Sequence, residues 1–308
     1  MGVNFTDFTK GIRKEAFKTG KQATCTHGGA LQSLMKIMTS ENLNQNRMDW
    51  LTDDLHVSEK GDILYFVGCA PYFDAFFTEL EVDTLAIAKS SIRLLNALGI
   101  KPVLLKNERC CGHDLLWSGD VENFTMLAGA NLDEIKKLNP KKVVFSCAEC
   151  YRTFKLDYTE LAGSLDFEMV HLSEFLSEHV ADNGLKFKKI EEKVTFQDPC
   201  RLGRSLGVYD PPRDILNSIP GLEFQEMPKN RQNATCCGTN SWINCDSYSR
   251  MIQNYRLKMA RDTGAEVLVT SCPKCYIHFS CAMQGDKFPE EEKVQIKDLA
   301  VVAAEALG

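Results

Sequence analysis

A repeated pattern of cysteines constrains this chain more than any other feature. Each copy contains a single cysteine, then a Cys-Cys-Gly triplet, then a C-x-x-C pair. The first copy is Cys69, Cys110-Cys111-Gly112 and Cys147-Ala-Glu-Cys150, and the second is Cys200, Cys236-Cys237-Gly238 and Cys272-Pro-Lys-Cys275. Equivalent positions are 131, 126 and 125 residues apart, so the loop lengths of the copies agree closely. The pattern therefore indicates an internal duplication with one site in each half.

Disulfide bonds are a poor explanation for 13 cysteines in this chain. Disulfide frameworks are typical of short secreted proteins, whereas this chain has 308 residues and starts without the apolar core of a signal peptide. It also lacks a run of about 18 apolar residues. We therefore expect a cytoplasmic protein with reduced thiols and no direct membrane insertion. The net charge of −6 argues against nucleic-acid binding.

The segments around the cysteines predict an α/β fold. Apolar, strand-forming runs lead to Cys69, Cys147, Cys200 and Cys272. Between or after them, 81–98 and 246–262 have apolar residues at helical spacing, including Leu85, Ile92, Leu95 and Leu98, and Tyr248, Ile252, Tyr255 and Met259. Alternating strands and helices predict two homologous halves with mostly parallel sheets and cysteines at the carboxyl ends of strands. Helix N-termini there would favour thiolates, and Gly112 and Gly238 would allow a positive φ or close backbone approach.

The number of cysteines distinguishes between two kinds of metal site. A structural zinc site needs four thiolates, and each copy offers five. Adjacent cysteines are awkward as two ligands of one small ion and fit better on different irons of a cluster. We therefore expect an iron–sulfur cluster in each half, with zinc as the alternative.

The spacing resembles that of the duplicated cysteine-rich CCG domain of heterodisulfide reductase, in its B-type subunit and the relatives of that subunit. Here 35 residues separate Cys111 from Cys147, and 34 separate Cys237 from Cys272. The resemblance covers about residues 59–290 and implies two noncubane [4Fe-4S] clusters. It assigns the first to Cys69, Cys110, Cys111, Cys147 and Cys150, and the second to Cys200, Cys236, Cys237, Cys272 and Cys275.

Because both motifs are complete, the resemblance favours a catalytic oxidoreductase subunit over one that only transfers electrons. The implied reaction reduces a disulfide of the coenzyme M and coenzyme B type, as in methanogenesis, or runs in reverse, with one sulfur captured by each of two facing clusters. The alternative is a non-catalytic iron–sulfur subunit that serves a hydroxyacid dehydrogenase or a sulfur-metabolising complex.

Partner subunits are expected because the chain has no ferredoxin-type C-x₂-C-x₂-C-x₃-C-P run. The resemblance implies a ferredoxin-like iron–sulfur subunit, the C-type of that family, and a flavin subunit, its A-type. We expect an N-terminal extension at 1–58 and two CCG domains at 59–190 and 191–308. Leu31, Leu34, Met35 and Met38 could line a docking helix in the extension, or pack against the chain itself.

A few other residues are candidates for secondary roles. His113 follows the first triplet and could donate a proton to a nascent thiolate, while the second copy has Thr239 there. Arg201, Arg204 and Lys274 adjoin second-copy ligands and could bind an anionic substrate, or could be ordinary solvated charges. Cys25, Cys245 and Cys281 lie outside the repeat and are expected to be ordinary buried cysteines, although Cys25, beside His27, could assist a partner's cluster.

Overall fold

The computed structural model describes the whole chain except residues 1, 3, 183, 286 and 287. Its strands form two sheets in which every pair of neighbours is parallel. The first sheet has the order β1-β2-β3, with β1 at Ile63–Phe66, β2 at Lys142–Phe145 and β3 at Glu168–His171. The second has the order β5-β4-β6-β7, with β4 at Glu192–Gln197, β5 at Leu222–Phe224, β6 at Val267–Thr270 and β7 at Gln295–Asp298.

Helices precede and follow these strands. Those up to the end of the first half are α1 Phe5–Lys18, α2 Ala30–Ile37, α3 Ala70–Phe76, α4 Thr84–Ala97, α5 His113–Ser118, α6 Val121–Leu138, α7 Ala148–Arg152, α8 Thr159–Ala162 and α9 Leu172–Ala181. Those of the second half are α10 Gly203–Leu206, α11 Asp210–Ser218, α12 Ser247–Arg261, α13 Pro273–Met283 and α14 Leu299–Glu305. Short helical turns lie at His27–Gly29, Thr78–Leu80, Thr153–Tyr158, Arg231–Asn233 and Glu290–Glu292.

The two sheets repeat one topology, as the cysteine pattern predicts. Val103 bonds to the free edge of β1, where its N–H donates to the carbonyl of Ile63 at 2.8 Å and its carbonyl accepts from Tyr65 at 2.9 Å. This segment therefore has the same place beside β1 in the first sheet as β5 has beside β4 in the second. The predicted duplicated α/β fold with parallel sheets is confirmed.

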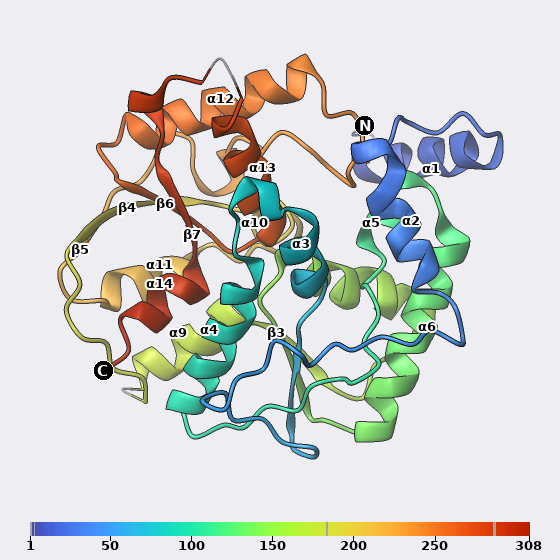
Figure 1. The fold of residues 1–308 in the computed structure, drawn as a ribbon, viewed down its shortest axis with the longest axis horizontal. Coiled ribbons are helices and arrows are strands. Elements are labelled where there is room, and N and C mark those ends of the chain that lie inside the picture. Colours follow the sequence, from blue (N-terminus) through green and yellow to red (C-terminus); the bar gives the residue numbers. More distant parts are fainter. Residues whose placement is uncertain (1, 3, 183, 286–287) are drawn as a thin grey trace.

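The halves are not independent bodies, because both hydrophobic cores contain residues from each half. In one core Leu95 and Leu176 of the first half lie with Ile215 and Val302 of the second, all fully buried. Helix α14, near the C-terminus, packs against α4 (Figure 1). This shared packing fixes how the carboxyl ends of the two sheets face each other.

The N-terminal extension packs against both halves. The side chains of Leu31, Met35 and Met38 are buried in the core, so this helix packs on its own chain, the second of its two expected uses. The Gln32 side chain donates to the carbonyls of Ser241 and Trp242 at 2.9 and 3.2 Å. Segment 24–32 thus holds loop 239–246 of the second half.

Helix α12 lies where 246–262 predicts it, but its apolar residues are not all buried. Tyr248 is 72% exposed, and Ile252 and Tyr255 are also exposed, whereas Met259 is buried. The spacing therefore predicts the helix correctly while overstating how much of that face meets the core. Among the described residues, no helix is both long and apolar enough to cross a bilayer.

The shared core leads to a stability prediction. Replacing Leu95 by alanine should lower the free energy of unfolding by about 2–5 kcal/mol, because it leaves a cavity in a core to which both halves contribute. Denaturant unfolding measures this, and both halves should unfold in one transition. The matched control Leu161→Ala, at an exposed position, should change stability by no more than about 0.5 kcal/mol. Separate transitions of the two halves would contradict the shared core.

Candidate metal centre

Four of the repeated cysteines lie just beyond the carboxyl ends of strands. Cys69 follows β1 and is the N-cap residue of α3. Cys147 and Cys272 are the N-cap residues of α7 and α13, and Cys200 lies in the turn after β4. Because free N–H groups and the partial positive charge of a helix dipole stabilise anions, these positions suit thiolates.

The ten thiols form one continuous series that crosses between the halves. In the first half each interacts with the next in the order Cys69, Cys110, Cys111, Cys150 and Cys147. The second half repeats this order as Cys200, Cys236, Cys237, Cys275 and Cys272. Cys147 also interacts with Cys272. The structure thus brings together all ten predicted ligands, in two adjacent groups of five.

Within each group, hydrogen bonds between thiols favour particular thiolates. Cys111 and Cys69 hold the pKa of Cys110 well below its usual value, and Cys150 and Cys272 do the same for Cys147. In the second group, Cys236 and Cys275 lower the pKa of Cys237 to about 6. Such thiolates are ready ligands for soft metals and iron–sulfur clusters.

Glycines permit the tight backbone around these thiols. Gly112 and Gly238 have φ values of 79° and 93°, as predicted. An added Cβ would meet a helix rather than the thiols, at 2.7 Å from Phe124 in the first copy and from Ser249 and Gln253 in the second. At Gly68 a Cβ would lie 3.1 Å from the sulfur of Cys150, so that glycine does make room beside a predicted ligand.

A buried ion pair supports the single cysteine of each half. In the first half Glu108 accepts from the N–H groups of Val67 and Gly68 at 3.0 and 2.7 Å and pairs with Arg47 at 2.6 Å. Burial raises the pKa of Glu108 to about 7, although Arg47 and both N–H groups oppose this. These bonds fix the backbone just before Cys69.

In the second half Asp198 has the equivalent role. Arg213 donates to both of its carboxylate oxygens at 2.8 and 2.9 Å, and the N–H of Arg231 donates at 2.7 Å. A two-pronged contact of this kind fixes orientation as well as distance. The backbone before Cys200 is therefore held as firmly as that before Cys69.

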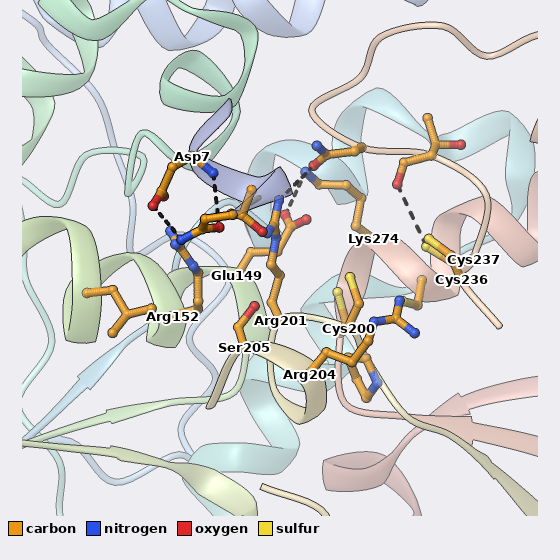
Figure 2. Close-up of a pocket in the computed structure, with 18 residues that line it drawn as sticks. Asp7, Glu149, Arg152, Cys200, Arg201, Arg204, Ser205, Cys236, Cys237 and Lys274 are labelled. Carbon is orange, nitrogen blue, oxygen red and sulfur yellow. Dashed lines mark hydrogen bonds and ion pairs between the residues drawn. The ribbon is translucent and has the colours of Figure 1, made fainter. Parts of the chain in front are cut away.

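Lys274 joins the two groups of cysteines. It lies between Cys272 and Cys275, yet its ammonium group pairs with two carboxylates of the first half. One is Asp114, and the other is Glu149, at 2.6 Å (Figure 2). Burial disfavours the charge of Lys274, but the two carboxylates raise its pKa well above the usual value. Burial favours a raised pKa for Glu149, while the Lys274 ammonium at 2.6 Å opposes that rise and favours the carboxylate. His113, Asp114 and Glu149 could together ligate a cation, and the Lys274 ammonium already supplies that positive charge.

His113 does not line the cavity beside the cysteines. It is 1% exposed, and its Nδ1 lies 2.8 Å from Asp114. Burial lowers its pKa well below the usual value, so the imidazole is neutral at neutral pH. The structure thus places His113 against Asp114, away from the cavity that Lys274 lines.

A cavity of about 510 Å³ opens onto the second group of cysteines. All five of them line it, together with Lys274 and Glu149. Arg152, Arg201 and Arg204 add positive charge to its walls, and Asn4, Thr6 and Asp7 at the start of α1 line it as well (Figure 2). The guanidinium of Arg201 lies 3.9 Å from the ring centroid of Trp117, a first-half residue. The cavity thus lies between the halves and the N-terminal segment.

The three remaining cysteines lie in or near loop 239–246 and helix α12. Cys25 forms an antiparallel bridge with Ile243, Cys245 is exposed, and Arg250 donates to the sulfur of Cys281 at 3.7 Å. The expectation that all three are buried is wrong for Cys245, which the turn before α12 places at the surface. Cys25 and Cys281 are only half-buried.

Comparison with known protein families agrees with the duplicated site. The model of the cysteine-rich domain called CCG matches residues 63–155 and 194–280, more than half of the chain. The chain belongs to the CCG cysteine-rich domain family. Both matched segments begin in the first strand of a half and end beyond its C-x-x-C pair, so each CCG copy contains one complete group of five cysteines.

The relatives of these CCG domains are subunits of iron–sulfur oxidoreductases. The chain is 32% identical, over all of its length and 74% of the relative, to the D-type subunit of the dihydromethanophenazine:CoB–CoM heterodisulfide reductase of Methanosarcina acetivorans. The D-type subunit from Methanosarcina barkeri is 34% identical over 86% of this chain and 63% of its own length. The resemblance to the B-type subunit is corrected to the D-type, because the cysteine spacing defines the domain and not the larger protein that contains it.

Other relatives show how widely these domains occur. The EtfAB:quinone oxidoreductase of Syntrophomonas wolfei is 29% identical over 80% of this chain and 34% of its own length. The crystal structure of a hypothetical protein from Helicobacter pylori superposes with a TM-score of 0.57 at 14% identity, over 89% of this chain and 56% of that protein. The latter supports the fold alone.

The support of Cys69 by Glu108 can be tested by Glu108→Gln. The neutral amide cannot balance the charge of Arg47, which leaves a buried cation unbalanced next to Gly68. We expect iron bound per chain to fall to about half, through loss of the first group, and the thermal midpoint to fall. The control Glu59→Gln removes an exposed ion pair with Lys106 and should change neither quantity. An unchanged iron content in Glu108→Gln would refute the role of this pair.

Proposed function

We propose that the chain is the catalytic iron–sulfur subunit of a heterodisulfide reductase-like complex. In this proposal each group of five cysteines holds one noncubane [4Fe-4S] cluster, and the protein reduces a disulfide of the coenzyme M–coenzyme B type or oxidises the two thiols. The observation that carries it is the cavity lined by five cysteines and by Lys274, Arg201 and Arg204. Reduction consumes two electrons and two protons, breaks the S–S bond and releases two thiols.

The residues present fit such clusters. Each group offers five buried or half-buried thiols in mutual contact, including an adjacent pair that a four-ligand zinc site would not use. Glycine at 68 leaves room next to Cys150. When bound, the clusters would supply one-electron chemistry and Lewis-acidic iron for sulfur.

The chain's own side chains would bind and orient the substrate. Arg201 and Arg204 are held by bonds to Asn240 and to the carbonyl of Ala234, at 3.3 and 2.5 Å, so their guanidinium groups are positioned in advance. Such groups suit carboxylate, sulfonate or phosphate on a thiol compound. The charged, buried Lys274 ammonium would lie near the developing thiolate at the second group.

Partners are part of the proposal. Electrons would come from a ferredoxin-like subunit, which would in turn receive them from a flavin subunit, and the complex would work in the cytoplasm. The extension at 1–58 would contact a partner through the exposed face of α1, which bears Phe5, Phe8 and Ile12. The likeness to an EtfAB:quinone oxidoreductase favours one alternative, an electron-transfer subunit that does no disulfide chemistry.

Metal content tests the proposal first. Protein purified without oxygen should contain about eight iron and about eight sulfide per chain, as two four-iron clusters require. Electron paramagnetic resonance should show a signal that changes when a thiol substrate is added. Iron without any response to thiols would favour the electron-transfer alternative, and zinc in place of iron would refute the proposal.

The cavity cations allow a second test. Replacing Arg201 with glutamine should raise the KM for an anionic disulfide about tenfold or more, since a charge-assisted hydrogen bond contributes about 1.5–3 kcal/mol. Iron content should stay unchanged. The control Arg93→Gln affects an exposed pair with Asp54 and should leave the KM alone. An unchanged KM in Arg201→Gln would remove this residue from the binding site.

A further inference from the structure

The two cysteine groups repeat each other in sequence but differ in the charges around them. Around the first group the charges are mostly negative. Asp114 lies four residues after Cys110, and Glu149 lies between Cys147 and Cys150, so two carboxylates adjoin ligands of the first group. The nearby cation is Arg47, which donates to the carbonyl of Gly68, next to Cys69, at 2.5 Å. Its charge is balanced by Glu108 at 2.6 Å.

Around the second group the charges are mostly positive. Arg201 directly follows Cys200 and lines the cavity. Arg256, fully buried, lies close enough to Cys275 for their charges to interact. Arg204 and Lys274 line the cavity that these cysteines share. The nearby carboxyl groups are Asp7 and Glu149, which line the cavity, and Asp298, which is buried near Cys272. Glu149 is paired with Lys274.

The contrast is sharpest at two equivalent positions. Glu149 and Lys274 both occupy the third place of their C-x-x-C motifs, 125 residues apart, and they contact each other at 2.6 Å. One position holds an anion and the other holds a cation. The two copies therefore differ in charge at the junction itself.

We infer that the second group holds the more easily reduced of the two clusters and that Lys274 is a positioning residue that makes it so. This rests on the proposed function, in that both groups must hold clusters. One-electron reduction adds one negative charge to a cluster, so nearby cations stabilise the reduced form and nearby anions oppose it. The effect is strong here because the charges are buried, where the effective dielectric constant is low. The first electron therefore reduces the cluster beside the cavity.

The test measures the reduction potentials of the anaerobic holoprotein, titrated with dithionite as the electron donor and followed by electron paramagnetic resonance. The Cys69→Ser and Cys200→Ser variants assign each signal to its group. In the unmodified protein the second group should have the higher potential. Lys274→Met should lower the second group's potential by at least about 59 mV, which corresponds to a tenfold change in the one-electron reduction equilibrium. It should lower the first group's potential less.

Asp114→Asn provides a variant with the opposite expected sign. It removes a negative charge near Cys110 while Lys274 keeps its partner Glu149, so folding should survive and the first group's potential should rise more than the second's. Lys297→Met is the matched control, since Lys297 also lies between two carboxylates, Glu192 at 2.8 Å and Glu305 at 3.0 Å, on the far strand β7. It should lower stability without moving either potential.

Each outcome has a definite meaning. A chain that binds no iron at either group refutes the proposed function. Two clusters with equal potentials, or with the first group higher, overturn this inference and leave the proposed function intact. The inference also fails if Lys274→Met and Asp114→Asn shift the potentials no more than Lys297→Met does.

Discussion

The arrangement of both cysteine groups depends on the ion pairs that the buried ammonium group of Lys274 forms. Taking a charge out of water costs several kcal/mol, and only well-placed opposite charges offset that cost. Here both offsetting carboxylates, Asp114 and Glu149, come from the other half of the chain. The lysine is therefore stable only when the halves are docked in one particular way, and that docking brings Cys147 to Cys272.

The same docking creates the cavity. Its walls come from α7 of the first half, the turn after Cys200 in the second, and the first turn of α1. The guanidinium of Arg201 stacks on Trp117 of the first half. It is therefore a second contact between the halves, beside the ion pairs of Lys274. Behind the junction, Glu108 with Arg47 and Asp198 with Arg213 fix the backbone before the single cysteine of each half. The site is thus rigid at its base and polar at its opening.

Much of the fold could be predicted from the sequence, because its signals are local or repeated. Strands such as Ile63–Phe66 and Val267–Thr270 are short apolar runs, and Cys69 and Cys272 lie next to them in the chain. The pairing of Glu149 with Lys274 could not be predicted, since nothing local to either residue specifies its partner. Comparing equivalent positions of the repeat would have revealed the opposite charges. Helical spacing at Tyr248 likewise predicts α12 but not which side of the helix faces solvent. The hydrogen bonds from the backbone N–H groups of Val67 and Gly68 to Glu108 could not be predicted either, because they join residues far apart in the sequence.

The contact between Glu149 and Lys274 also bears on the history of the chain. In a dimer of two identical copies related by a two-fold axis, contacts between equivalent residues place each residue against itself. A glutamate at this position would then face a glutamate, and a lysine would face a lysine, with repulsion in either case. Only after the coding sequence was duplicated could the two positions differ. The ion pair therefore requires two non-identical copies, and this chain can no longer be divided into two equal halves that pair with themselves.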